Sequence, residues 1–131
     1  MQRRYPEGQQ ENLQGSTFMA TPRLSDNPMY LLLRMGDIEE FNRRKAAGEV
    51  CDLTACDLSR LDLRNLDASG LDLRDCYFRS SDLRGIDLRS TNLEGASFAQ
   101  AFVSGCYLPR EISPQEMTMA LEHGTRVRYG A

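Results

Sequence analysis

From Cys51 to Arg110 the chain reads CDLTA CDLSR LDLRN LDASG LDLRD CYFRS SDLRG IDLRS TNLEG ASFAQ AFVSG CYLPR, twelve blocks of five without an insertion. The third place of every block is apolar, and the second place is Asp or Asn in eight of the twelve. A short period that stays in phase over such a stretch indicates a repeat architecture, in which every block is one unit of the same structure.

A period of five residues fits neither an amphipathic helix nor a flat strand. Five residues turn a helix by about 500°, so the apolar third places would not form one stripe. In a flat strand the first and third places share a face, but the next block begins on the opposite face. The chain must therefore bend in every block, with the first and third places pointing inward. Glycine in the fifth place, as at Gly70, Gly85, Gly95 and Gly105, suits a corner with positive φ.

These blocks resemble the bacterial pentapeptide-repeat proteins, whose motif runs A-(D/N)-L-x-x. The resemblance implies an all-β solenoid, a right-handed quadrilateral β-helix in which four repeats close one coil. Residues 51–110 would then form about three coils, capped by short α-helices at both ends. The chain departs from the motif in the first place, where leucine, isoleucine or cysteine often replaces alanine. The alternative fold is a leucine-rich repeat, but its period of roughly 20–29 residues does not match uniform blocks of five.

Residues 28–50 are predicted to form an N-terminal helical cap of two short helices. Asp37, with Glu40 three residues later, is a capping pattern for the second helix, and Gly48 is expected to end it. Residues 1–27 are polar and lack a hydrophobic period, so they are interpreted as a disordered tail. The alternative is a tag-derived segment, because ENLQGS resembles the remnant of a protease-cleavable tag.

Residues 111–131 are predicted to form a C-terminal helical cap. Ser113 followed by Pro114 is typical of a helix start, and Gly124 of a helix end. In several proteins of the family that the repeats resemble, a C-terminal element mediates a two-fold dimer. We therefore expect a homodimer. Its candidate interface combines outward aromatics of the last coil with residues of the C-terminal helix, namely Phe102, Tyr107, Met117, Met119 and Leu121.

The composition predicts a cytoplasmic protein that contacts neither a membrane nor nucleic acid directly. Charged residues make up 27% of the chain, yet the net charge is only −3 and no long basic or acidic block occurs. No apolar run is long enough to span a bilayer, and the N-terminus lacks a secretory leader. In such a compartment the four cysteines are expected to be free thiols.

The sequence offers no pattern that predicts catalysis, a metal site or a cofactor. Cys51, Cys56, Cys76 and Cys106 all occupy first places, so they are expected to fill the core as small apolar residues. His123 falls at the end of the predicted C-terminal helix, where a capping role suffices. We expect a protein that is not an enzyme and that holds no metal and no cofactor.

We therefore expect the outer surface of the repeats to carry the function. The protein is expected to be a protein–protein interaction module whose partner is unknown. Arginines in the fourth place alternate with aspartates in the second place, which predicts a mutually neutralised shell or a face that docks a partner. The candidate partner-binding residues are Arg64, Arg74, Arg79, Arg84 and Arg89. The alternative function, implied by the family resemblance, is a DNA mimic that regulates or protects a type II topoisomerase.

Overall fold

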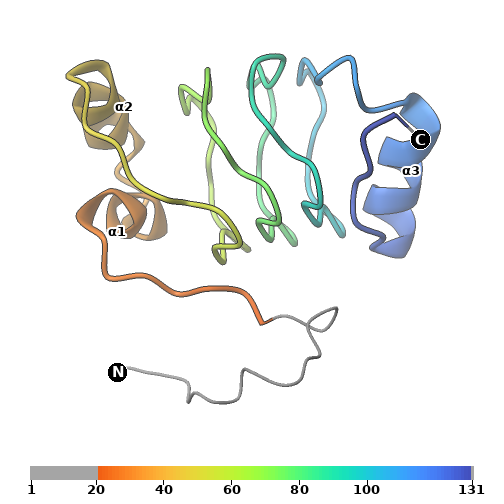
Figure 1. The fold of residues 1–131 in the computed structure, drawn as a ribbon, viewed down its shortest axis with the longest axis horizontal. Helices are drawn as coiled ribbons and strands as arrows, with labels where there is room; N and C mark the ends of the chain where they lie inside the picture. Colours follow the sequence, from red (N-terminus) through yellow and green to blue (C-terminus); the bar gives the residue numbers. More distant parts are fainter. Residues whose placement is uncertain (1–20, 131) are drawn as a thin grey trace.

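The computed structural model describes residues 21–130 of the protein, and in this range three α-helices flank the repeats. Helix α1 spans Pro28–Met35, α2 spans Ile38–Ala46 and α3 spans Pro114–His123. Figure 1 shows α1 and α2 at one end of the stacked repeats and α3 at the other end. In the described range, no helix is both long and apolar enough to cross a membrane.

Residues twenty apart in the repeats lie next to one another, so four blocks form one layer of a stack. We call residues 51–110 the repeat stack. Its layers are residues 51–70, 71–90 and 91–110, and isolated parallel bridges join them. The bridges link Asp57 with Tyr77, Asp62 with Asp82, Asp72 with Asn92, Tyr77 with Ser97, Asp82 with Phe102, and Asp87 with Tyr107.

The prediction of an all-β solenoid, a right-handed quadrilateral β-helix, is wrong. Within residues 21–130 the regular elements are the three helices, and no β-strand or sheet forms. The reason lies in the fifth place, which has positive φ in ten of the twelve blocks. Four of these residues are glycines, and the others are Ala55, Arg60, Asn65, Asp75, Ser80 and Gln100. Because left-handed backbone cannot continue a strand, each stretch of extended chain ends before a ladder of bridges can form.

The interior of the repeat stack follows the predicted five-residue register. Ten of the twelve third-place side chains are buried, and the last two, Val103 and Leu108, are half-buried. Residues of successive layers pack directly on one another, as Phe78 and Phe98 do with ring centroids 5.0 Å apart. The apolar side chains of the three layers thus form one continuous core with those of the helices.

The stack has four sides, each made of one block from every layer. The first side holds residues 51–55, 71–75 and 91–95; the second 56–60, 76–80 and 96–100; the third 61–65, 81–85 and 101–105; and the fourth 66–70, 86–90 and 106–110. Second-place side chains point outward on every side, so these sides are the surfaces on which a partner can dock.

The N-terminal helices supply hydrogen-bond partners to the open edge of the first layer. The Tyr30 hydroxyl donates to the Asp57 carbonyl at 2.8 Å. The Asn42 amide donates to the Asn65 carbonyl and its oxygen accepts from the Asp67 N–H, both at 2.9 Å. Backbone N–H and carbonyl groups at the edge of the first layer would otherwise need water as a hydrogen-bond partner. Side chains of α1 and α2 take that role instead.

The segment that leads into α1 also contacts the first layer. The Arg23 N–H donates to the Ala55 carbonyl at 2.7 Å, and the Arg23 carbonyl accepts from the Asp57 N–H at 2.9 Å. Residues 21–27 belong to the stretch 1–27 for which the composition predicts a disordered tail. The remainder of that stretch, residues 1–20, lies outside the described residues.

The C-terminal segment covers the opposite edge. The Ser113 hydroxyl accepts from the Glu116 N–H at the start of α3, and Gly124, with φ of 72°, ends the helix. The chain then turns back along the third layer. There the Gly95 N–H donates to the Val127 carbonyl at 2.7 Å and the Val127 N–H donates to the Ala96 carbonyl at 2.9 Å.

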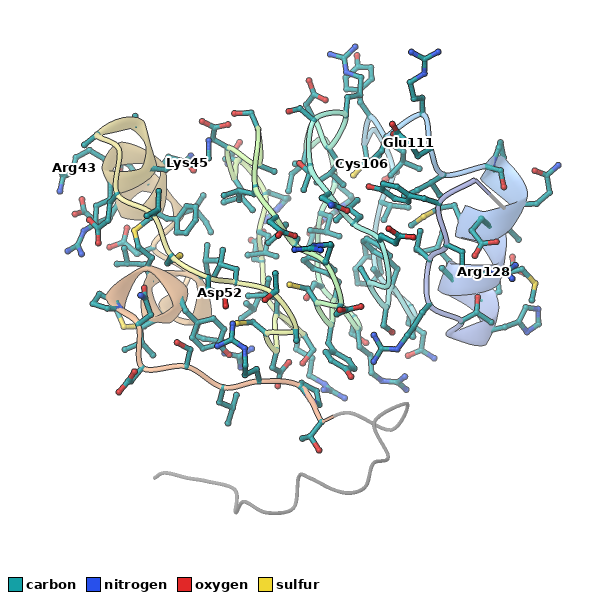
Figure 2. All side chains as sticks on the ribbon, in the orientation of Figure 1. Arg43, Lys45, Asp52, Cys106, Glu111 and Arg128 are labelled. Atoms are coloured by element: carbon teal, nitrogen blue, oxygen red, sulfur yellow. The ribbon has the colours of Figure 1, made fainter. Side chains whose placement is uncertain are left out.

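A buried carboxylate fixes α3 to this returning segment. Glu116 accepts hydrogen bonds from the Arg128 backbone N–H at 3.0 Å and from Arg128 Nε at 3.1 Å. Figure 2 shows Arg128 on the segment that runs beside α3. The pair lowers the pKa of Glu116. The carboxylate is thereby kept charged in a position that is only 5% exposed.

Candidate interaction surface

Second-place carboxylates and amides hold the turns of the repeat stack. Every second-place Asp or Asn accepts a hydrogen bond from the backbone N–H two residues later, at 2.9 to 3.2 Å. This contact is the turn motif that Asp and Asn side chains favour. One oxygen of each of these side chains is therefore occupied by the backbone and is less available to a partner.

Most fourth-place arginines form ion pairs inside their own block. In Arg64, Arg74, Arg84 and Arg89 the guanidinium binds the aspartate two residues earlier through two parallel hydrogen bonds. Such two-pronged geometry is favourable for arginine and carboxylate. Hydrogen bonds from Arg64 lower the pKa of Asp62 to about 2.

This register and geometry match those of pentapeptide repeats. The family model of pentapeptide repeats, with eight copies, matches residues 51–85 and 72–108. The chain belongs to the pentapeptide-repeat family. No curated protein sequence and no solved structure gives a significant match to the chain.

The candidate partner-binding arginines do not form one site in this pentapeptide-repeat protein. Arg74 lies on the first side of the repeat stack, Arg79 on the second, and Arg89 on the fourth. Only Arg64 and Arg84 share a side, where Arg64 Nε also lies 3.4 Å from the Asp82 carboxylate. Four of the five are neutralised within their blocks, so Arg79 is the exception.

The five candidate dimer residues divide into two groups. Phe102, Tyr107 and Met119 are 56%, 58% and 45% exposed. Met117 is buried and Leu121 is half-buried, so both take part in the core of the protein itself. Only the first group is accessible to a second molecule. One face of the Tyr107 ring is covered by the Arg89 guanidinium, 4.6 Å from its centroid.

Two cysteines of this pentapeptide-repeat protein, Cys56 and Cys76, pack inside the repeat stack, and Cys51 and Cys106 are half-buried against its core. Cys56 and Cys76 are fully buried, and burial raises the pKa of their thiols to about 11 and about 12. The Cys76 thiol donates to the Leu53 carbonyl at 2.9 Å. Because the thiolate is the form that attacks substrates and binds metals, these positions favour a structural role.

A shallow groove of about 1010 Å³ separates the start of α2 from the third side of the stack. Its lining includes Asp37, the N-cap of α2, and Glu39 of that helix, together with Asp62, Arg64 and Arg84 from the repeats. The groove could not be predicted from the sequence, because it joins residues far apart in the chain. Its mixed charges give no preference for one class of ligand.

Acid should destabilise the protein below about pH 4. The pKa values of Asp62, Asp87 and Glu40 are about 2 in the folded protein, below their ordinary values of 3.8 and 4.5. Groups shifted in this direction stabilise the fold fully above their unfolded pKa, and the contribution is lost as pH falls toward about 2. The urea midpoint should therefore fall between about pH 5 and about pH 2.5. An unchanged midpoint would contradict this account, and Asp62→Asn with Asp87→Asn should flatten the dependence.

Proposed function

We propose that this pentapeptide-repeat protein is a non-catalytic protein–protein interaction module of the cytoplasm that pairs with a second copy through its C-terminal end. The observation that carries the proposal is the exposure of Phe102, Tyr107 and Met119, which are each about half accessible. Large exposed apolar side chains are typical of a covered surface. Leu24, Leu31, Met35 and Val50 are also exposed and belong to the N-terminal part of the chain, so a variant there is needed to distinguish the two ends. The four free cysteines fit a reducing compartment.

Mimicry of duplex DNA receives less support from the charges of the surface. A mimic must present a regular series of uncompensated negative charges, since duplex DNA carries one about every 1.7 Å. On the third side, Asp62 and Asp82 are each bound by an arginine of the same block. The two carboxylates and two arginines of that side cancel one another.

Light scattering tests the proposed self-association. The chain has a mass of 14.8 kDa, and we expect a mass near twice that value at tens of micromolar protein. Tyr107→Glu or Met119→Glu should return the mass to that of one chain, because each places a carboxylate in an apolar contact. Met35→Glu, which alters an exposed methionine on α1 at the opposite end, is the matched control.

Two results would overturn the proposal of a C-terminal dimer. One is a monomeric mass at every concentration tested. The other is a dimer that survives both Tyr107→Glu and Met119→Glu but dissociates with Met35→Glu, since this would place the contact at α1.

A further inference from the structure

Arg79 differs from the other fourth-place arginines of the repeat stack because the second place of its block is Tyr77. Arg60 stands in a fifth place, and its block uses Asp57 to hold the turn. The Asp57 carboxylate accepts from the Ser59 N–H at 3.0 Å and from the Ser59 hydroxyl. Among residues 21–130, no carboxylate lies within 4.0 Å of the guanidinium of Arg60 or Arg79.

Arg60 and Arg79 are neighbours on successive layers of the second side. The Arg60 N–H donates to the Arg79 carbonyl at 2.8 Å, which brings the two backbones into contact. Arg34 of α1 reaches the same place, because its guanidinium donates to the Ser59 carbonyl at 3.1 Å. All three arginine side chains are exposed.

A fourth arginine reaches the second side from the C-terminal segment. Arg126 forms a bridge with Ser97, and its guanidinium donates to the Gly95 carbonyl at 2.7 Å. The same guanidinium lies over the ring of Tyr77, 4.8 Å from its centroid. Arginines from α1, from two layers of the stack and from the C-terminal segment therefore gather on one side.

The second side is the basic side of the stack. Its blocks carry Arg60 and Arg79 against the single carboxylate of Asp57, a net charge of +1, and the flanking segments add the guanidiniums of Arg34 and Arg126. The adjoining first side is acidic: its blocks carry one arginine against four carboxylates, those of Asp52, Asp72, Asp75 and Glu94. Arg23, whose guanidinium lies 3.5 Å from the Asp52 carboxylate, does not reverse that sign. On the third and fourth sides the block charges cancel.

The length and width of this basic surface determine which kind of ligand it can bind. Three layers at about 4.8 Å give a basic strip about 14 Å long, which roughly four extended residues span. A duplex nucleic acid is wider than one side and would bring its phosphates against the acidic first side. A narrow chain with aspartate or glutamate side chains can instead stay on the basic strip, where the guanidiniums of Arg60 and Arg79 can each bind a carboxylate in two-pronged geometry.

We infer that the second side, through Arg34, Arg60, Arg79 and Arg126, binds an acidic linear segment of a partner protein. The inference deepens the proposed function and rests on it, since it names the chemistry of a partner for the same interaction module. The proposed dimer uses Phe102, Tyr107 and Met119, and none of these residues belongs to the second side.

Fluorescence anisotropy with labelled hexaglutamate tests the inference on the full chain. We expect saturable binding at low ionic strength that weakens as salt is raised, because exposed charges are screened over about 10 Å at 0.1 M salt. Arg60→Ala and Arg79→Ala should each weaken binding by about two- to fivefold, the range for one exposed ion pair. Arg60→Glu combined with Arg79→Glu should remove it. The matched control is Arg84→Ala, which alters the exposed fourth-place arginine of the next block, already paired with Asp82.

Three results would overturn the inference: no binding of hexaglutamate at low salt, equal losses from Arg84→Ala and Arg79→Ala, or tighter binding of a DNA duplex than of hexaglutamate. Neutral hexaglutamine should not bind. Light scattering on the same samples separates the two proposals. A dimer that ignores hexaglutamate refutes only the acidic-segment site, and a monomer that binds it refutes only the self-association.

Discussion

Leu83→Asp is expected to abolish cooperative unfolding of the protein. Leu83 is 1% exposed in the middle layer of the repeat stack, with layers packed above and below it. Its N–H donates to the Phe102 carbonyl at 2.8 Å, and its carbonyl accepts from the Cys106 thiol at 2.7 Å. A carboxylate there has apolar neighbours and no cation, and such burial costs several kcal/mol. A small domain has only about 5–15 kcal/mol of stability, so the substitution should consume most of it.

Ser104→Asp is the control for this experiment. Ser104 is an exposed fourth-place residue on the same side of the stack as Leu83, so the new carboxylate stays in water. Its effect should remain within about 0.5 kcal/mol. Urea unfolding followed by circular dichroism measures both variants. If Leu83→Asp unfolds with the midpoint of the unsubstituted protein, the inward assignment of the third place is incorrect.

The register of the repeats could be predicted from the sequence because it depends on five-residue periodicity alone. An apolar residue in every third place must point inward if each block bends, and the buried positions follow this rule from Leu53 to Phe98. The helix boundaries were also readable. Asp37 accepts from the Glu40 N–H at the start of α2, and α3 begins after Ser113 and ends before Gly124. These signals are local, so the sequence displays them directly.

The secondary structure of the repeats could not be predicted in the same way. Periodicity shows that the chain bends, but it does not show how much extended backbone remains between bends. The positive φ of residues such as Arg60 and Asp75 shortens each extended stretch to a single bridge. The side chain of Arg60 does not indicate a left-handed conformation, which L-residues with bulky side chains seldom adopt, whereas aspartate, as at Asp75, adopts it more readily.

The basic second side was missed because its arginines come from separate parts of the chain. Arg60 and Arg79 meet through the stacking of layers, and Arg34 and Arg126 join them from the two ends. One local signal was available. The block that holds Arg79 has Tyr77 in its second place, where the other blocks with a fourth-place arginine have aspartate, so Arg79 could have been separated from the neutralised set.

Phe78→Ala is expected to destabilise the protein by about 3–5 kcal/mol, the usual cost of replacing a buried phenylalanine with alanine. Phe78 is 1% exposed in the middle layer, and its ring stacks on that of Phe98 with an interplanar angle of 13°. The substitution removes this contact and leaves a cavity between two layers. The layers are tied by backbone hydrogen bonds on every side, including Phe78 N–H to the Ser97 carbonyl at 2.8 Å, so they cannot readily collapse into the space.

Phe102→Ala provides a control with the same chemical change at the surface. Phe102 is 56% exposed, so its loss should alter the free energy of unfolding by no more than about 0.5 kcal/mol. Both variants should be unfolded with urea at a protein concentration where light scattering gives the mass of one chain, because Phe102 also belongs to the proposed dimer interface. Equal losses of stability from the two variants would mean that the layers are not packed through Phe78. A large loss from Phe78→Ala alone would establish that stacking between layers, rather than the turns within each layer, supplies much of the stability of the repeats.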